Sequence, residues 1–409
     1  MAPPKLLTNV ALGDSATGLQ MSTICEPTVA GSSKRLFATG NWFASRSIDG
    51  GTTWTFVNPF TELPSVAGGF CCDQVVRYSK RHRRWIWYLQ YDSTAAGENV
   101  MRIAISVTGA PGSWTWVDIA PTDLDPAWTG EWFDYPNIAE TDGFLYISSN
   151  VYRDKAWRRC VVVRFPLRAV IAGAALEPEV WSSTQVGSVR LVQGAAAEMF
   201  FAGHGRLDRL ELHSWPDDDP SVSHWSIPIR AWRDDRSSAY SSQGPGGQEW
   251  LARADGRITA GWADAASIGF GWTANSDATH PHPYIRIVRI NPATMTVRDE
   301  PDLWSAVGAW AFPAASPNGR GRVGLASIFG GPTHPAFVVA TLDTTSGASP
   351  SWSVATVATS TAGPVDGLFG DYVSVAAHPT LPTTWVAAGF TLQGGPGRLD
   401  VEPRVVLFR

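Results

Sequence analysis

The chain has 409 residues, with 32 Lys and Arg against 37 Asp and Glu, so its net charge is −5. Charged residues make up 17%, below the roughly 25% of an average soluble protein, and the 39 Gly and 29 Pro follow no triplet period. An apolar content of 44% argues against a disordered chain, the lack of a long apolar run argues against a membrane span, and the acidic balance argues against a nucleic-acid partner.

One structural unit repeats along the chain. Each copy reads as an apolar strand, a tight polar turn, a second strand, a connection of variable length, a third strand, a turn, and a strand that usually contains Trp. The copies cover residues 25–57, 71–119, 133–182, 188–229, 248–304, 310–358 and 371–408. The 20 Trp, 17 Phe and 9 Tyr suit such strands, because aromatic residues favour pleated, half-buried surfaces.

Seven copies over 409 residues give a repeat of about 58 residues, which is typical of four-stranded propeller blades with loops. The sequence therefore predicts an all-β, seven-bladed β-propeller of antiparallel blades, forming a single domain over residues 1–409. The seventh copy lacks its fourth strand, and residues 5–12 are expected to supply it and close the ring, which removes an exposed sheet edge. A pair of β-sandwiches is the rival architecture, but it requires a central linker that the sequence does not show.

The first copy contains a short motif with a known relative. Residues 47–54 fit the pattern S-x-D-x-G-x-x-W, with Ser47, Asp49, Gly51 and Trp54 at its fixed positions, and residues 106–114 form a degenerate version. This motif resembles the Asp-box of the sialidase-like propellers, where it is structural. Sialidases have six blades and an early R-I-P arginine, both of which this chain lacks. Seven-bladed polysaccharide lyases, which use His, Tyr and Arg, are similar at the level of the fold.

Four cysteines occur, and none has metal-binding spacing. Cys71 and Cys72 are adjacent, so they either form a strained disulfide in an oxidising compartment or are two small buried residues at the start of a strand. No apolar signal segment begins the chain, yet few Lys and many Trp are typical of a secreted or extracellular protein, which is the expected location.

The propeller geometry predicts which side chains meet on one face. The starts of the first strands and the connections between second and third strands share that face. The first strands contribute Glu26, Asp73, Gln74, Asp134, Tyr135, Glu249, Asp371 and Tyr372. The second strands and the connections contribute Trp42, Tyr91, Asn150, Arg153, His204, His280, His282, Tyr284 and His334. Converging polar groups of this kind indicate a ligand site, although the acids could instead cap backbone amides.

We expect a carbohydrate-active enzyme, and favour a lyase that cleaves a uronic-acid-containing glycan by β-elimination. Arg153 would neutralise the substrate carboxylate, Tyr135 and the imidazoles of His204 and His334 would move protons, and Asp134 completes the catalytic set. The remaining residues of the face would bind substrate.

Two other functions stay open. A sialidase-like glycoside hydrolase would use two of the carboxyl groups on either side of the glycosidic oxygen. A non-catalytic glycan-binding propeller should repeat one binding motif in every blade, whereas the connections differ strongly here; a protein-interaction scaffold should expose an apolar patch. We expect an oligo- or polysaccharide partner, a monomer, no nucleic acid, no membrane and no metal centre, with calcium in the central channel as the one ion considered.

Overall fold

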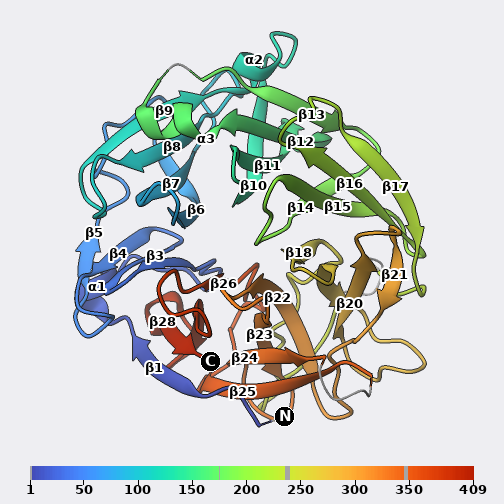
Figure 1. Ribbon diagram of the computed structural model, residues 1–409. Helices are drawn as coiled ribbons and strands as arrows, with labels where there is room; N and C mark the ends of the chain where they lie inside the picture. The colour runs from blue at the N-terminus through green and yellow to red at the C-terminus, as the bar shows by residue number, and fades with distance from the viewer. Residues whose placement is uncertain (1, 175, 235–239, 345–348) are drawn as a thin grey trace.

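Seven four-stranded antiparallel sheets surround a central channel in the computed structural model, which describes residues 2–174, 176–234, 240–344 and 349–409 (Figure 1). The first three blades comprise β2 (Thr28–Ser32), β3 (Arg35–Gly40), β4 (Phe43–Ser47) and β5 (Thr55–Val57); β6 (Phe70–Ser79), β7 (Arg84–Tyr91), β8 (Met101–Ser106) and β9 (Trp114–Ile119); β10 (Glu131–Glu140), β11 (Phe144–Arg153), β12 (Ala156–Pro166) and β13 (Glu179–Ser183). The predicted seven-bladed propeller is confirmed.

The next three blades follow in chain order around the ring. They comprise β14 (Gly187–Leu191), β15 (Glu198–Arg206), β16 (Arg209–Pro216) and β17 (Ser223–Pro228); β18 (Ile258–Ala263), β19 (Ile268–Ala274), β20 (Tyr284–Asn291) and β21 (Thr296–Asp299); β22 (Ala309–Pro317), β23 (Val323–Gly330), β24 (Ala336–Asp343) and β25 (Ser351–Thr359). The helices are short: α1 (Asp14–Thr17), α2 (Pro121–Leu124), α3 (Leu167–Ala172) and a 3-10 turn (Arg398–Asp400). No helix in the described ranges has the length and apolarity needed to cross a bilayer.

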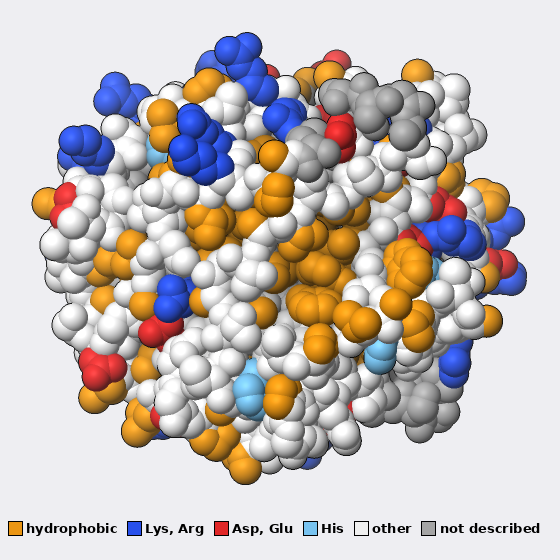
Figure 2. Space-filling model, turned by 90° about the horizontal axis from the view of Figure 1, so that it is seen from below, with side chains coloured by type: hydrophobic (Ala, Val, Ile, Leu, Met, Phe, Trp, Pro, Cys, Tyr) orange, Lys and Arg blue, Asp and Glu red, His pale blue; other side chains and the backbone are white. Residues whose placement is uncertain are grey.

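The two chain ends close the ring, as the sequence predicts. The last blade has the order β26 (Ser374–Ala377), β27 (Trp385–Leu392), β28 (Val401–Phe408) and β1 (Leu6–Ala11). Asn9 on β1 also donates a hydrogen bond to the Val357 carbonyl of the neighbouring blade, at 2.8 Å. Figure 2 views the propeller edge-on, from the side where β1 and β25 lie at the bottom of Figure 1. It shows hydrophobic side chains gathered in the middle of that side. The first and last strands thus join one sheet, and β28 does not present a free edge.

The fifth blade starts one strand later than the repeat pattern predicts. Residues 248–254 were expected to form its innermost strand, but they form turns and an isolated bridge between Gln243 and Glu249. The innermost strand is β18, and every later strand of this blade moves by one position. The carboxylate of Glu249 accepts hydrogen bonds from the backbone amides of Ser242, Trp250 and Leu251 at 2.8–2.9 Å, which holds this segment as a turn.

The Asp-box forms the local structure that its sequence predicts. Asp49 Oδ1 accepts hydrogen bonds from the Ser47 hydroxyl at 2.8 Å and from the Thr53 amide at 2.9 Å, and Gly51 has φ +94°, a value that favours glycine. Hydrogen bonds from Thr53 lower the pKa of Asp49 to about 2. The motif therefore stabilises the turn between β4 and β5.

Candidate functional site

The inner strands bend where they enter the channel. Glu26, Tyr135, Ser188 and Phe312 each stand at or near such an entry, with φ between +49° and +57°. In β10, β14 and β22 the pairing register shifts at this point, which marks a β-bulge. Bulges redirect side chains, and left-handed backbone in residues other than glycine is concentrated at functional sites. The bends therefore determine which side chains face the mouth of the channel.

Four carboxyl groups from four blades interact at this mouth. Glu26, Asp73 and Asp371 are only 5–7% exposed, and Asp134 is half-buried. Glu26 accepts a hydrogen bond from Asn41 at 2.8 Å, and Asp134 accepts one from Gln90 at 3.2 Å. Because each acid lies within the electrostatic field of at least one other, they cannot all ionise freely.

Glu26 and Asp73 form a coupled pair. Burial raises the pKa of Glu26 well above its usual range, and the negative charges of Asp73 and Asp371 raise it further. Burial, followed by the charge of Asp134, raises the pKa of Asp73 to about 7. A hydrogen bond joins the two carboxyls, and it requires a proton on one of them. The pair can therefore hold a proton near neutral pH.

Asp371 has a different environment. Arg253 donates to its two carboxylate oxygens, through Nε to Oδ1 at 2.9 Å and through Nη2 to Oδ2. A second guanidinium, that of Arg257, lies 3.8 Å from Asp371 Oδ2. Paired hydrogen bonds from one guanidinium to a carboxylate are strong and orient both groups. The mouth thus combines a carboxyl pair that retains a proton with a carboxylate held between two cations.

Aromatic rings enclose these groups. The Arg257 guanidinium carbon lies 4.1 Å from the centre of the Tyr135 ring, and Tyr135 meets Tyr372 edge to face with ring centres 6.1 Å apart. Burial raises the pKa of both tyrosines well above the usual range. Their hydroxyls are therefore neutral and act as hydrogen-bonding groups at physiological pH.

A cavity of about 690 Å³ adjoins this cluster and shares Arg257 with it. It is formed by the second-to-third strand connections of blades three and four and the entry to blade five. The lining residues are Tyr152, Trp157, Gln185, Gly187, Ser188, His204, Gly205, Arg206, Leu207, Trp232, Asp234, Asp255, Gly256, Arg257 and Ile258. Aromatic faces combined with a few polar groups are typical of ligand pockets, and this volume is in their usual range.

His204 borders the cavity but lies among aromatic rings. Its imidazole is centred 4.8 Å from Trp232 and 4.6 Å from Trp272. Burial lowers the pKa of His204 to about 3, so the ring is neutral at physiological pH. The side chain is therefore placed to contact a ligand, while its basicity is weak.

Several predicted site residues make their contacts elsewhere. Arg153 pairs with Glu131 at 3.4 Å, His334 lies beside Gly244, and the Tyr91 hydroxyl accepts a hydrogen bond from Arg102 at 2.7 Å. None of these contacts involves the four carboxyls.

The remaining candidates have local structural contacts. Gln74 bonds to the Gly40 and Phe43 carbonyls, Asn150 bonds to Ser188, Trp42 lies 5.6 Å from the Arg398 guanidinium, and Glu249 caps the turn described above. His280 stacks on Tyr284 with ring centres 3.8 Å apart and bonds to Asp277, while His282 is half-buried in the same connection. The structure thus brings together Glu26, Asp73, Asp134, Tyr135, Asp371 and Tyr372 from the predicted set.

The sequence prediction missed Arg253 and Arg257. Both lie in the segment assigned to the wrong strands of the fifth copy, so they were not placed at the channel entry. The usable signal was the R-x-D-x-R spacing of residues 253–257, which brings two cations and one acid to the approach of an inner strand. Asp255 bonds to Arg257 Nε at 2.9 Å.

Cys71 and Cys72 form a disulfide immediately before Asp73. The pairing of β6 with β7 is interrupted between Phe70 and Gln74, where the disulfide lies. Within the described part of the chain, no three His, Cys, Asp or Glu side chains are arranged to hold a metal ion.

Stability is expected to fall as the pH rises from about 4 to above 7. The pKa of Asp73 is raised to about 7 in the folded protein, so the folded state binds this proton more tightly than the unfolded chain does. The stabilisation from this proton is complete below the pKa that Asp73 has in the unfolded chain. It is lost as the pH rises through the pKa that Asp73 has in the folded protein. The unfolding temperatures of the wild type and of Asp73→Asn at pH 5 and 8 measure this contribution of Asp73. An equal pH dependence in both proteins would contradict the prediction.

Comparison with known proteins finds distant structural likeness alone. No family model and no curated protein matches the sequence. The fold is similar to that of the GH93 α-L-arabinofuranosidase of Fusarium graminearum in complex with arabinobiose, with 11% identity, TM-score 0.47 and coverage of 99% of this chain and 98% of the other. It is also similar to the α-L-arabinanase of Penicillium chrysogenum complexed with arabinobiose, with 12% identity, TM-score 0.46 and coverage of 98% of this chain and 98% of the other. A protein of unknown function from Dyadobacter fermentans has 10% identity, TM-score 0.47 and coverage of 100% of both chains. Such distant likeness does not assign an activity.

Proposed function

We propose that the protein is a glycoside hydrolase that cleaves an oligosaccharide at the mouth of the channel, where carboxyl groups perform acid catalysis and charge stabilisation. The observation that carries this proposal is the contrast between Asp73, which shares a proton with Glu26, and Asp371, which Arg253 and Arg257 hold as an ion pair. Two carboxyl groups with opposite environments are the arrangement that glycosidic hydrolysis needs.

Each group has a role in this proposal. Asp73 donates a proton to the leaving oxygen, since an acid whose pKa is near the working pH is the most effective donor. Asp371 faces the positive charge that develops on the sugar ring, and a water molecule then adds to the anomeric carbon and returns a proton to the Asp73 carboxylate. The adjoining cavity receives the rest of the oligosaccharide, with Tyr152, Trp157 and Trp232 offering flat surfaces for sugar rings.

The same contacts make β-elimination the weaker candidate. A lyase needs a base to remove a carbon-bound proton, yet Tyr135 is buried under Arg257 with its pKa raised, and the pKa of His204 is lowered to about 3. Arg153, proposed to neutralise a uronate, is paired with Glu131 instead.

A substrate screen with two readouts tests the proposal. The panel holds arabino- and galacto-oligosaccharides and uronate-containing polysaccharides, and each reaction is followed by reducing ends and by the ultraviolet absorbance of an unsaturated uronate. We expect reducing ends without the absorbance, and a rate that falls above pH 7 as Asp73 loses its proton. Absorbance would establish a lyase, and binding without any product would establish a lectin.

A further inference from the structure

A second, smaller cavity lies among the inner strands and is bordered by Tyr372. Its volume is about 50 Å³, enough for about three or four water-sized groups. The wall consists mostly of inner-strand residues such as Val76, Ala314 and Val375, and it includes Tyr372 and two arginines, Arg77 and Arg190. The acids of the catalytic proposal are not among its lining residues.

Arg190 is a cation without a counter-charge. Across the described ranges, its side chain takes part in no hydrogen bond and no ion pair, and its Nε is completely enclosed without a partner. Burial is the main influence on the pKa of Arg190 and lowers it, and the nearby charge of Arg77 acts in the same direction. A guanidinium nevertheless stays protonated in proteins, so the half-buried side chain of Arg190 carries a positive charge that remains to be balanced.

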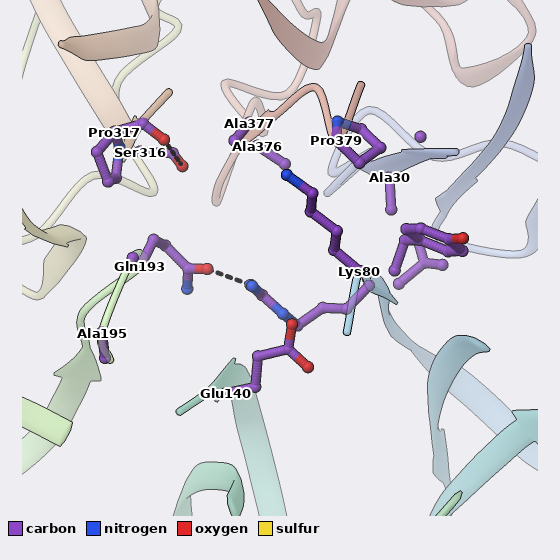
Figure 3. A pocket seen from close by; sticks show the side chains of 15 residues that line it. Ala30, Lys80, Glu140, Gln193, Ala195, Ser316, Pro317, Ala376, Ala377 and Pro379 are labelled. Atoms are coloured by element: carbon purple, nitrogen blue, oxygen red, sulfur yellow. Dashed lines mark hydrogen bonds between the residues drawn. The ribbon is translucent and has the colours of Figure 1, made fainter. Parts of the chain in front are cut away.

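Arg77 lies further down the channel and is only partly balanced. Its Nη1 donates to the side chain of Gln193, the contact drawn as a dashed line in Figure 3, and to the Ile138 carbonyl at 3.3 Å. Glu140 acts on Arg77 electrostatically and supplies one negative charge on this side of the channel. Two guanidiniums thus share one cavity with a single acid near only one of them.

Tyr372 gives independent evidence that the cavity binds a ligand. It is 7% exposed, and its hydroxyl has no hydrogen-bond partner among the residues that the structure describes. A buried hydroxyl without a partner is destabilising, so this position favours a hydrogen-bond acceptor. Arg190 interacts electrostatically with this same tyrosine.

We propose that the channel holds a small monovalent anion of the size of chloride, bound between Arg190, Arg77 and the hydroxyl of Tyr372. A wider chamber of about 200 Å³, which shares Arg77 and Gln193 with the cavity, gives a route for exchange; Lys80 projects into it (Figure 3). Tyr372 adjoins both this cavity and the carboxyl cluster, and the proposal does not depend on the hydrolase activity.

Halide-dependent thermal stability tests the site. Unfolding is measured in sodium chloride, bromide and gluconate at equal ionic strength. At a halide concentration 100 times the dissociation constant we expect the midpoint to rise by about 3 °C over gluconate. The rise should vanish in Arg190→Met and persist in Arg209→Met, which makes the same change on β16, the third strand of the same blade. Equal midpoints in all three salts, or an unchanged halide response in Arg190→Met, would overturn the proposal.

A second measurement uses the wild type alone, in case Arg190→Met does not fold. Crystals soaked in bromide should give an anomalous peak in the channel within hydrogen-bonding reach of Arg190. Peaks restricted to the outer surface would show adventitious halide only and would contradict the proposed site.

Discussion

Replacing Asp73 with asparagine is expected to lower kcat by about 10²–10⁴-fold, the usual contribution of a positioned general acid. Asparagine keeps the size of the side chain and can still bond to Glu26, so the fold should persist. The amide cannot donate a proton of comparable acidity to a leaving oxygen. The measurement is steady-state hydrolysis of the best substrate from the screen, with circular dichroism as the check on folding.

The matched control is Asp154→Asn. Asp154 is exposed, lies in the connection after β11 on the same face, and already has a positive φ that asparagine tolerates. Its variant should retain wild-type activity. If Asp73→Asn is as active as this control, Asp73 is not the acid and the hydrolase mechanism loses its proton donor.

Replacing Arg286 with alanine is expected to destabilise the protein by about 3–5 kcal/mol, the cost of removing the buried partner of two acids. The partly exposed Arg230, which also pairs with both acids, remains. Arg286 is fully buried on β20 and bonds to Asp302 at 2.8 Å and to Glu300 at 2.5 Å. Its removal leaves both acids facing a cavity. Urea unfolding of wild type and variant measures the difference.

Arg298→Ala is the control for this substitution. Arg298 is 44% exposed and lies 3.7 Å from Asp299, so the pair is screened by water, and its loss should cost less than about 1 kcal/mol. Equal destabilisation by the two variants would show that the buried cluster does not stabilise the blade.

The architecture could be predicted because every blade repeats the same pattern of apolar strands and polar turns. The prediction was wrong at the fifth blade for a physical reason. Residues 248–254 carry Trp and Leu and look like a strand, but the carboxylate of Glu249 binds three backbone amides and replaces strand pairing. A pattern of residue types does not reveal such a side-chain cap.

The candidate site could be predicted in part. Topology alone places the starts of the inner strands at one mouth, which gathers Asp73, Asp134 and Asp371. Arg253 and Arg257 were missed because the shifted fifth blade hid their position. The role predicted for His204 also depends on its surroundings, since Trp232 and Trp272 come from distant parts of the chain and remove the water that would support a charged imidazole.

The position of a bound oligosaccharide tests the central claim most directly. Crystals of Asp73→Asn are soaked with the best substrate from the screen. The account predicts a glycosidic oxygen within hydrogen-bonding reach of residue 73, a sugar ring facing Asp371, and further sugars in the cavity lined by Trp157 and Trp232. Sugar density confined to the outer surface of the blades, with the mouth unoccupied, would contradict it.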